Sequence, residues 1–264
     1  MTALKGLRAL QVRPEQSDDL FARQLMEAGA TLYCCPVMLI KPFAETPEEN
    51  QIKSQILNFD QYQIAIFISK TAARLGTEWL ARYWTALPES LPQNLRYYAV
   101  GKSTAALLRE QGIEAELPKQ AFNSEGLLAL SSLHSVTGEK ALIFSGEGGR
   151  TLLADTLSQR GASVSECELY RREPTAEFAD QIINFLAVRG VDLVIAHSGE
   201  LLKNLLAVVP ERQLPTLMNL PLLVPSERVA EIARNTGFQA VICAGSALPE
   251  DMVSALRGWY SSSR

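Results

Sequence analysis

One stretch of the chain occurs twice, as GLRALQVRPEQSDDLFARQLMEAGATLYCC at residues 6–35 and as GEKALIFSGEGGRTLLADTLSQRGASVSEC at residues 138–167. At an offset of 132, identical residues recur at Gly6, Ala9, Leu10, Leu20, Ala22, Leu25, Gly29, Ala30 and Cys35. The similarity then continues in order, with Ser69 matching Ser198 at an offset of 129 and Gly112 matching Gly237 at an offset of 125. Self-similarity at a nearly fixed offset is typical of a duplicated chain. The sequence therefore predicts two copies of one structural unit.

Apolar runs of strand length alternate with patterns of helical spacing throughout both copies. The runs are 7–12, 64–68, 97–100, 141–144, 193–196, 222–224 and 240–244. Two of the helical patterns end at Gly29 and Gly161, where glycine is a common C-terminal cap. This alternation predicts an α/β fold with two Rossmann-like (flavodoxin-like) parallel-sheet domains. Two charged stretches, 32–43 and 164–174, each read as a long exposed strand that could connect the two lobes.

Composition excludes several classes of protein. The chain has 264 residues, 47% hydrophobic and 20% charged, which is the balance of a globular protein rather than a disordered one. A net charge of -4 argues against a protein that binds duplex nucleic acid. We expect no membrane span and no signal peptide, and hence a cytoplasmic protein. The four cysteines contain no C-x-x-C pair, so we expect reduced thiols.

The turn SGEGGR at residues 145–150 lies between a predicted strand and a predicted helix. Backbone N–H groups of Gly148 and its neighbours, together with Arg150, could bind an anion there. A purely structural turn that needs glycine conformations explains the same sequence. A dinucleotide fingerprint is excluded because Thr151 stands where that motif needs its third glycine.

Polar residues also follow four other predicted strands. They are Ser69 with Thr71, Gly101 with Thr104, Ser198, and Ser226 with Arg228. The carboxyl ends of parallel strands face the ligand crevice of an open α/β sheet, so these groups could bind a ligand. Each of them could equally be a helix N-cap.

Tyr170 lies in the second charged stretch and could donate a proton to a ligand, although packing of the ring is the commoner role of such a residue. His134 and His197 stand alone, so a metal site is not expected. The chain contains no nucleophile elbow, Walker P-loop or zinc-protease motif.

Taken together, the short motifs resemble those of the uroporphyrinogen-III synthase family. They are VRP at 12–14, FISKTAA, AVGKSTAALL, NSEGLL, GEGGRTLLADTLSQRGASV, YRR, SGELLKNL and PSERVAEIA, in this order. The chain departs from the family pattern at Val12 and Thr71, where threonine and asparagine are frequent. The resemblance covers residues 12–237.

The resemblance implies two domains, one formed by 1–37 with 173–264 and one by 38–172, joined by a two-stranded linker with a cleft between them. It implies a lyase that cyclises hydroxymethylbilane, a linear tetrapyrrole with eight carboxylates, with loss of water and inversion of ring D. The product is uroporphyrinogen III, a precursor in heme, siroheme and cobalamin biosynthesis. No metal or organic cofactor is expected, and we expect a monomer that receives its substrate by transient hand-over from hydroxymethylbilane synthase.

The family pattern makes Tyr170 the candidate catalytic residue. The residues expected to bind substrate are Arg13, Ser69, Thr71, Gly101, Thr104, Gly148, Arg150, Ser198, Ser226 and Arg228. Two other functions fit the same fold: a non-enzymatic two-lobed protein that binds a small anion, and a nucleotide-dependent transferase that uses the glycine-rich turn.

Overall fold

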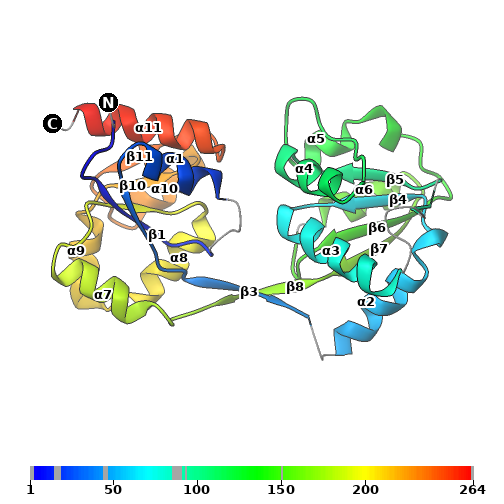
Figure 1. Cartoon of the computed structure of the whole chain (residues 1–264), viewed down its shortest axis with the longest axis horizontal. Helices are drawn as coiled ribbons and strands as arrows, with labels where there is room; N and C mark the ends of the chain where they lie inside the picture. The colour runs from blue at the N-terminus through cyan, green and yellow to red at the C-terminus, as the bar shows by residue number, and fades with distance from the viewer. Residues whose placement is uncertain are drawn as a thin grey trace. The chain divides into compact units, whose positions relative to one another are not determined.

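The computed structural model describes residues 3–14, 19–43, 47–84, 91–92, 94–149 and 151–262. The chain divides into two compact units: unit 1 is Met1–Leu39 with Glu173–Arg264, and unit 2 is Ile40–Arg172. Each unit has a parallel sheet packed against helices (Figure 1), which confirms the predicted fold class.

Unit 1 contains a parallel sheet in the strand order β11-β10-β9-β1-β2. Its strands are β1 (Arg8–Gln11), β2 (Thr31–Cys34), β9 (Leu193–Ile195), β10 (Leu222–Val224) and β11 (Val241–Cys243). In the register of the sheet, Leu10 of β1 lies beside Tyr33 of β2 and Val194 of β9. The N-terminal strand therefore belongs to the same sheet as the C-terminal half of the chain.

The helices of unit 1 bury both faces of this sheet. They are α1 (Leu20–Glu27), α7 (Ala179–Ala187), α8 (Gly199–Val208), the short 3₁₀ helix η3 (Glu211–Gln213), α9 (Leu214–Met218), α10 (Glu227–Asn235) and α11 (Pro249–Ser262). Phe21 of α1 and Leu256 of α11 share one buried core with Ala9 of β1. Because side chains alternate along a strand, the fully buried Leu10 points to the opposite face.

Unit 2 contains a parallel sheet in the order β5-β4-β6-β7. Its strands are β4 (Ile64–Phe67), β5 (Arg96–Ala99), β6 (Lys140–Ser145) and β7 (Ser163–Glu168). Its helices are α2 (Pro47–Leu57), η1 (Phe59–Gln61), α3 (Lys70–Tyr83), α4 (Lys102–Glu110), α5 (Ser124–Leu128), η2 (Ser131–Leu133) and α6 (Leu152–Gln159). Residues of α2, α3 and α4 share one core with Phe67 and Phe144, whereas α5 and α6 pack in a second core with Ile66 and Ile143. The rings of Phe67 and Phe144 stack with their centroids 4.4 Å apart.

The sequence repeat corresponds to a structural repeat. In unit 2, β6-α6-β7 takes the place that β1-α1-β2 takes in unit 1, and β4 and β5 take the places of β9 and β10. Gly29 and Gly161 end the two matching helices with φ values of 93° and 91°, a left-handed conformation that favours glycine. Unit 1 adds β11 at one edge of its sheet. At the matching edge of unit 2, the described residues form an isolated β-bridge between Tyr98 and Glu116.

The chain passes between the units in β3 (Met38–Pro42) and β8 (Tyr170–Pro174), which form a two-stranded sheet. The prediction of one long exposed strand in each of 32–43 and 164–174 was wrong. Each stretch is divided: β2 and β7 are edge strands of the two large sheets, and only the later residues form the linker. The breaks occur where the buried side chains of Cys35, Val37 and Leu169 anchor the chain to its units.

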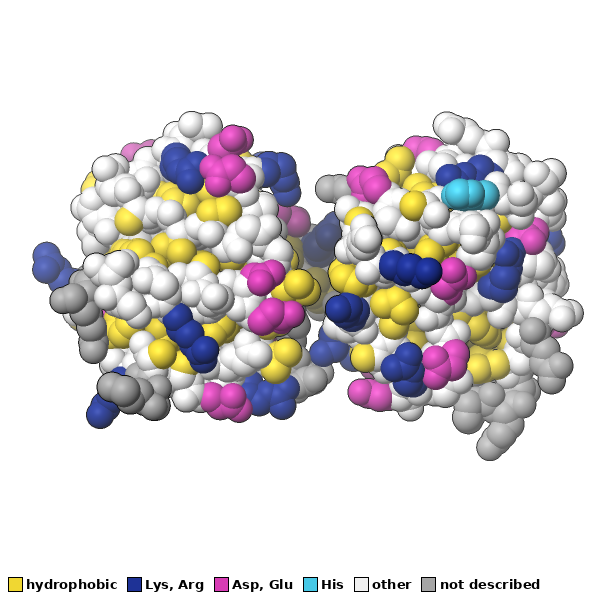
Figure 2. All heavy atoms as spheres, turned by 90° about the horizontal axis from the view of Figure 1, so that it is seen from above, with side chains coloured by type: hydrophobic (Ala, Val, Ile, Leu, Met, Phe, Trp, Pro, Cys, Tyr) yellow, Lys and Arg dark blue, Asp and Glu magenta, His cyan; other side chains and the backbone are white. Residues whose placement is uncertain are grey.

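The surface carries charges of both signs. On the face shown in Figure 2, basic and acidic side chains are interspersed over the described residues of both units. Across the described ranges, no helix has the length and apolar content that a bilayer span needs.

Candidate active site

The carboxyl ends of the strands gather most of the predicted residues in each unit. In unit 2, Ser69 follows β4, Gly101 lies just beyond β5, and Gly146 follows β6. In unit 1, Arg13, Ser198 and Ser226 follow β1, β9 and β10 in the same way. The order of connection reverses between β4 and β6 and between β9 and β1. Such switch points are where open α/β sheets bind ligands.

Tyr170 is fixed against the switch point of unit 2. Its hydroxyl lies 3.2 Å from Ser69 Oγ, and its ring is 5% exposed. A Cβ atom on Gly146 would lie 2.5 Å from Tyr170 Cε2, so only glycine leaves room for the ring. The Glu147 N–H donates to the Tyr170 carbonyl at 2.8 Å. The turn after β6 therefore positions the tyrosine, and the structure brings Tyr170 together with Ser69.

Ser69 also begins α3, so its hydroxyl has two roles. Its Oγ accepts a hydrogen bond from the Ala72 N–H at 3.0 Å, which is an N-cap. That bond leaves the hydroxyl proton for Tyr170 or for a ligand. Thr71 lies two residues further on, in the first turn of α3 and half-buried.

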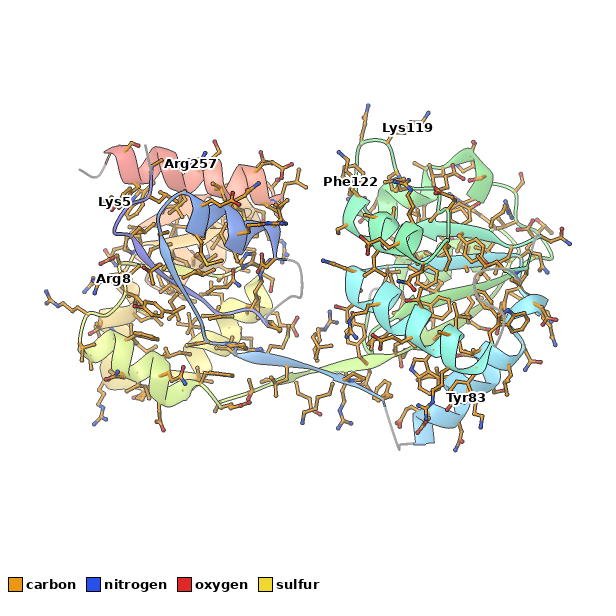
Figure 3. The ribbon with its side chains drawn as sticks, viewed as in Figure 1. Lys5, Arg8, Tyr83, Lys119, Phe122 and Arg257 are labelled. Carbon is orange, nitrogen blue, oxygen red and sulfur yellow. The ribbon has the colours of Figure 1, made fainter. Side chains whose placement is uncertain are left out.

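The N-terminus of α4 is the second anion-binding candidate of unit 2. Gly101 is its N-cap residue in an extended conformation and, lacking a side chain, leaves the first N–H groups without a side-chain partner. Thr104 lies in the same first turn and is buried. Lys102, absent from the predicted set, is exposed there, with its Nζ 5.1 Å from the centroid of the Phe122 ring. Phe122 is labelled in Figure 3. The position of Lys102 directly after Gly101 could have identified it.

The glycine-rich turn differs from the expectation of free N–H groups. Gly148 has a φ of 65°, but its N–H donates to Glu168 Oε1 at 3.2 Å. The Glu147 N–H donates its hydrogen bond to the Tyr170 carbonyl. The turn therefore already holds a carboxylate of its own chain, because Glu168 at the end of β7 lies beside it. Arg150 lies outside the described residues.

In unit 1, Arg13 is paired rather than free. Its Nη2 lies 2.5 Å from Asp19 Oδ1, and its guanidinium lies over the ring of Phe21 at 5.7 Å. Asp19 also caps α1 through the Ala22 N–H at 3.0 Å. Burial acts to raise the pKa of Asp19, but the cap and Arg13 outweigh burial and lower it. Asp19 was not predicted, although an aspartate just before a helix is a recognisable N-cap signal.

His197 lies beside the same pair. Its ring packs edge-on against Phe21 with centroids 5.2 Å apart, and neither ring nitrogen has a hydrogen-bond partner in the described part of the chain. Burial lowers the pKa of His197 to about 3, and the positive charge of Arg13 contributes to that lowering. A neutral imidazole, a guanidinium and a carboxylate therefore meet at the switch point of unit 1.

Ser198 and Ser226 each precede a helix, but only the Ser198 side chain caps its helix. Ser198 Oγ accepts from the Leu201 N–H at 3.2 Å and caps α8. Ser226 has the same extended conformation before α10, but its side chain makes no capping hydrogen bond. Arg228 is exposed in the first turn of α10. The hydroxyl of Ser226 is therefore the more available of the two for a ligand.

No group of three His, Cys, Asp or Glu side chains in the described ranges is arranged to hold a metal ion. The switch points of the two units instead carry hydroxyls, helix N-termini and cations. These groups suit the binding of carboxylates.

The family model, the related sequences and the similar structures described below all belong to the same family. The family model "Uroporphyrinogen-III synthase HemD" matches residues 19–254. The uroporphyrinogen-III synthase of Escherichia coli is 31% identical over 254 residues, covering 94% of this chain and 99% of that protein. Among solved structures, a mutant uroporphyrinogen III synthase from Thermus thermophilus superposes with a TM-score of 0.63 at 18% identity, covering 98% of this chain and 100% of that one. The uroporphyrinogen-III synthetase of Helicobacter pylori gives 0.58 at 12% identity, with coverages of 96% and 99%. The resemblance seen in the motifs is thereby confirmed, and the chain belongs to the uroporphyrinogen-III synthase family.

Proposed function

We propose that this chain performs the reaction of its family with Tyr170 as the proton donor. As a member of the family it is a cyclising lyase of tetrapyrrole biosynthesis, which converts hydroxymethylbilane into uroporphyrinogen III. The contact between the Tyr170 hydroxyl and Ser69 Oγ at 3.2 Å carries the proposal for the residue roles. This contact holds the Tyr170 hydroxyl in place, because Ser69 is itself fixed as the N-cap of α3.

The chemical step begins with the hydroxymethyl group of the substrate. Tyr170 donates its proton to the leaving oxygen, the carbon–oxygen bond breaks, and the bond's electron pair leaves with the oxygen as water. The remaining carbocation is stabilised by the adjacent pyrrole nitrogen. It is then attacked by the substituted carbon of the terminal pyrrole ring, which becomes a quaternary carbon. The older bond from that carbon to its methylene bridge breaks, which restores the pyrrole and leaves the methylene carbon as a second cation, stabilised by its own pyrrole nitrogen. The free α-carbon of the terminal ring attacks this cation, and the phenolate left on Tyr170 accepts the proton that this α-carbon loses, so bonds and protons balance.

Positioning is the second part of the proposal. The linear substrate carries carboxylates along its length, and the donors at the strand ends of each unit are the candidates to bind them. These donors are the hydroxyls of Thr71, Thr104, Ser198 and Ser226, the N–H groups at Gly101 and Gly148, and the cations of Arg13, Arg150 and Arg228. For Gly148 and Arg13, a substrate carboxylate would take the place of Glu168 and share the guanidinium with Asp19, respectively. Fixing the two ends of the substrate makes ring closure effectively intramolecular. Closure at the substituted carbon, followed by transfer of the methylene bridge to the other α-carbon, gives the inverted ring.

The test is the Tyr170→Phe variant, which keeps the buried ring and removes only the hydroxyl. We expect kcat to fall by about tenfold or more, because general acid catalysis contributes at least that much, while KM changes little. Tyr83→Phe is the matched control, since Tyr83 lies in α3 with its ring stacked on Trp79 at 5.2 Å. A Tyr170→Phe variant with full kcat and the type III product would remove Tyr170 from the mechanism.

We also propose a cytoplasmic monomer that receives hydroxymethylbilane by transient hand-over from hydroxymethylbilane synthase. Separate hydrophobic cores in the two units support the monomer, because neither unit needs a second copy to bury its sheet. Sedimentation analysis should give a mass near 29.0 kDa. A stable dimer at micromolar concentration would contradict this proposal.

A further inference from the structure

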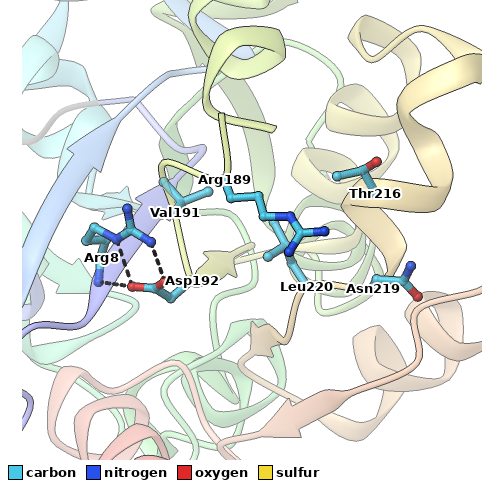
Figure 4. A pocket seen from close by; sticks show the side chains of 7 residues that line it. All are labelled: Arg8, Arg189, Val191, Asp192, Thr216, Asn219 and Leu220. Atoms are coloured by element: carbon cyan, nitrogen blue, oxygen red, sulfur yellow. Dashed lines mark hydrogen bonds and ion pairs between the residues drawn. The ribbon is translucent and has the colours of Figure 1, made fainter. Parts of the chain in front are cut away.

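Unit 1 contains a cavity at the opposite end of its strands from Ser198 and Ser226. The cavity has a volume of about 480 Å³, and its lining includes Arg8, Arg189, Asp192, Thr216, Asn219 and Leu220 (Figure 4). Arg8 is the first residue of β1, and Asp192 directly precedes β9. The cavity therefore lies at the amino ends of the strands, apart from the candidate active site. Its volume is in the range of small-molecule sites.

The backbone of Arg189 is strained. With a φ of 51°, it is the one residue other than glycine with a positive φ in the described ranges. It follows α7, and the Gly190 N–H donates to the Phe185 carbonyl at 2.8 Å, the hydrogen bond of a glycine-type helix end. At the corresponding ends of α1, α4, α6 and α10 the residues with positive φ are Gly29, Gly112, Gly161 and Gly237. The left-handed conformation is energetically unfavourable for arginine, because its Cβ atom crowds the backbone. Strain of this kind is often retained for function.

The side chain of Arg189 gives the cavity its net charge. Arg8 and Asp192 neutralise each other, with Arg8 Nη2 2.6 Å from Asp192 Oδ1 and Arg8 Nε 3.0 Å from Asp192 Oδ2. In the part of the chain that the structure describes, no carboxylate pairs with Arg189. Figure 4 shows its side chain extending across the cavity toward Leu220, with Thr216 and Asn219 beyond. One uncompensated guanidinium thus faces a hydroxyl and an amide.

We propose that this cavity binds the phosphate or carboxylate group of a small molecule, with Arg189 as its principal ligand. A guanidinium presents a planar set of N–H donors that matches both kinds of oxyanion. The Thr216 hydroxyl and the Asn219 amide supply further donors, while the hydrogen-bonded Arg8–Asp192 pair forms one wall without adding net charge. The proposal is independent of the activity assigned to the active site.

The first experiment titrates the ¹⁵N-labelled full chain with inorganic phosphate and, separately, with succinate. Chloride keeps the ionic strength constant, so that screening alone changes nothing. We expect saturable chemical-shift changes at the Asn219 side-chain amide and at the backbone amides of Arg189 and Leu220. Saturation by phosphate alone or by succinate alone identifies the oxyanion. The absence of saturation with both would overturn the proposal.

Two variants separate ligand binding from folding. Arg189→Gln keeps the strain and removes the charge, so the affinity for the bound anion should fall at least tenfold. Arg189→Gly should lose affinity to the same extent and raise the midpoint of thermal unfolding, because glycine relieves the strain. Arg257→Gln, at the exposed arginine of α11 labelled in Figure 3, should leave the affinity unchanged. Unchanged affinity in Arg189→Gln, or a lower unfolding midpoint in Arg189→Gly, would show that the arginine serves another purpose.

Discussion

At the scale of single residues, the candidate active site depends on close packing around Tyr170. The aromatic ring lies directly over Gly146, and its hydroxyl reaches Ser69. Tyrosine could be recognised from its place in the charged stretch. Its contact with Gly146 could not, because the two residues are brought together by the turn after β6 and by the start of β8.

Gly146→Ala is expected to displace Tyr170. The new methyl group would lie 2.5 Å and 2.6 Å from two ring carbons, so the ring must move and its contact with Ser69 is lost. We expect a loss of kcat similar to that of Tyr170→Phe, together with a loss of stability of about 1–3 kcal/mol for overpacking. Steady-state kinetics and urea unfolding measure the two effects. In the control Gly149→Ala the nearest atom is 3.4 Å away, so equal effects of both substitutions would contradict this account.

His197 makes the stability of the protein depend on pH. Its pKa is about 3 in the folded protein and about 6.5 when unfolded, so between these values the unfolded chain binds more protons. The free energy of unfolding therefore falls as the pH decreases below 6.5, by up to about 1.4 kcal/mol per pH unit from this residue. His197→Leu should flatten that slope in urea unfolding measured from about pH 7 to about pH 4. His134→Leu, at the exposed histidine, is the matched control, and an identical slope in wild type and His197→Leu would refute the assignment.

At the scale of helices and strands, the predicted residues divide into those used by the fold and those left for a ligand. Ser69 and Ser198 cap their helices, as the alternative reading of the sequence allowed. Ser226 occupies the same position without making a cap. Sequence alone could not separate these cases, because all three serines follow a strand and precede a helix.

Ser198→Ala and Ser226→Ala should therefore behave differently. Loss of the cap should reduce the free energy of unfolding by about 1 kcal/mol in Ser198→Ala, whereas Ser226→Ala should change it by less than about 0.5 kcal/mol. Both variants should raise KM for hydroxymethylbilane if both hydroxyls bind its carboxylates. Thermal unfolding and initial-rate kinetics give the two quantities. A Ser226→Ala variant with unchanged KM would exclude that serine from substrate binding.

Much of the fold could be predicted because its signals are local or repeated. The seven apolar runs correspond to β1, β4, β5, β6, β9, β10 and β11, and Gly29 and Gly161 end their helices as expected. The division of the stretches 32–43 and 164–174 was missed, since it depends on where Cys35 and Leu169 are buried by distant parts of the chain. The Arg13–Asp19–His197 cluster was missed for the same reason. Arg13 and Asp19 lie in the same connection after β1, whereas His197 follows β9 and joins them only through the β1–β9 pairing.

At the scale of the whole molecule, the duplicated units share the order of four strands, to which unit 1 adds β11, but they differ in chemistry. Tyr170 and Ser69 lie at the switch point of unit 2, whereas Arg13, Asp19 and His197 lie at that of unit 1. The sequence expected the first domain boundary after residue 37, and the compact units divide between Leu39 and Ile40. A chain with a net charge of -4 must attract a polyanionic substrate through local donors such as these.

The central claim is that the purified chain directs ring closure of hydroxymethylbilane to the inverted isomer. The most direct measurement supplies hydroxymethylbilane to the protein, oxidises the products and separates the isomers by chromatography. We expect the type III isomer to dominate and to form in proportion to the protein concentration. Formation of the type I isomer at the rate seen without protein would contradict the claim.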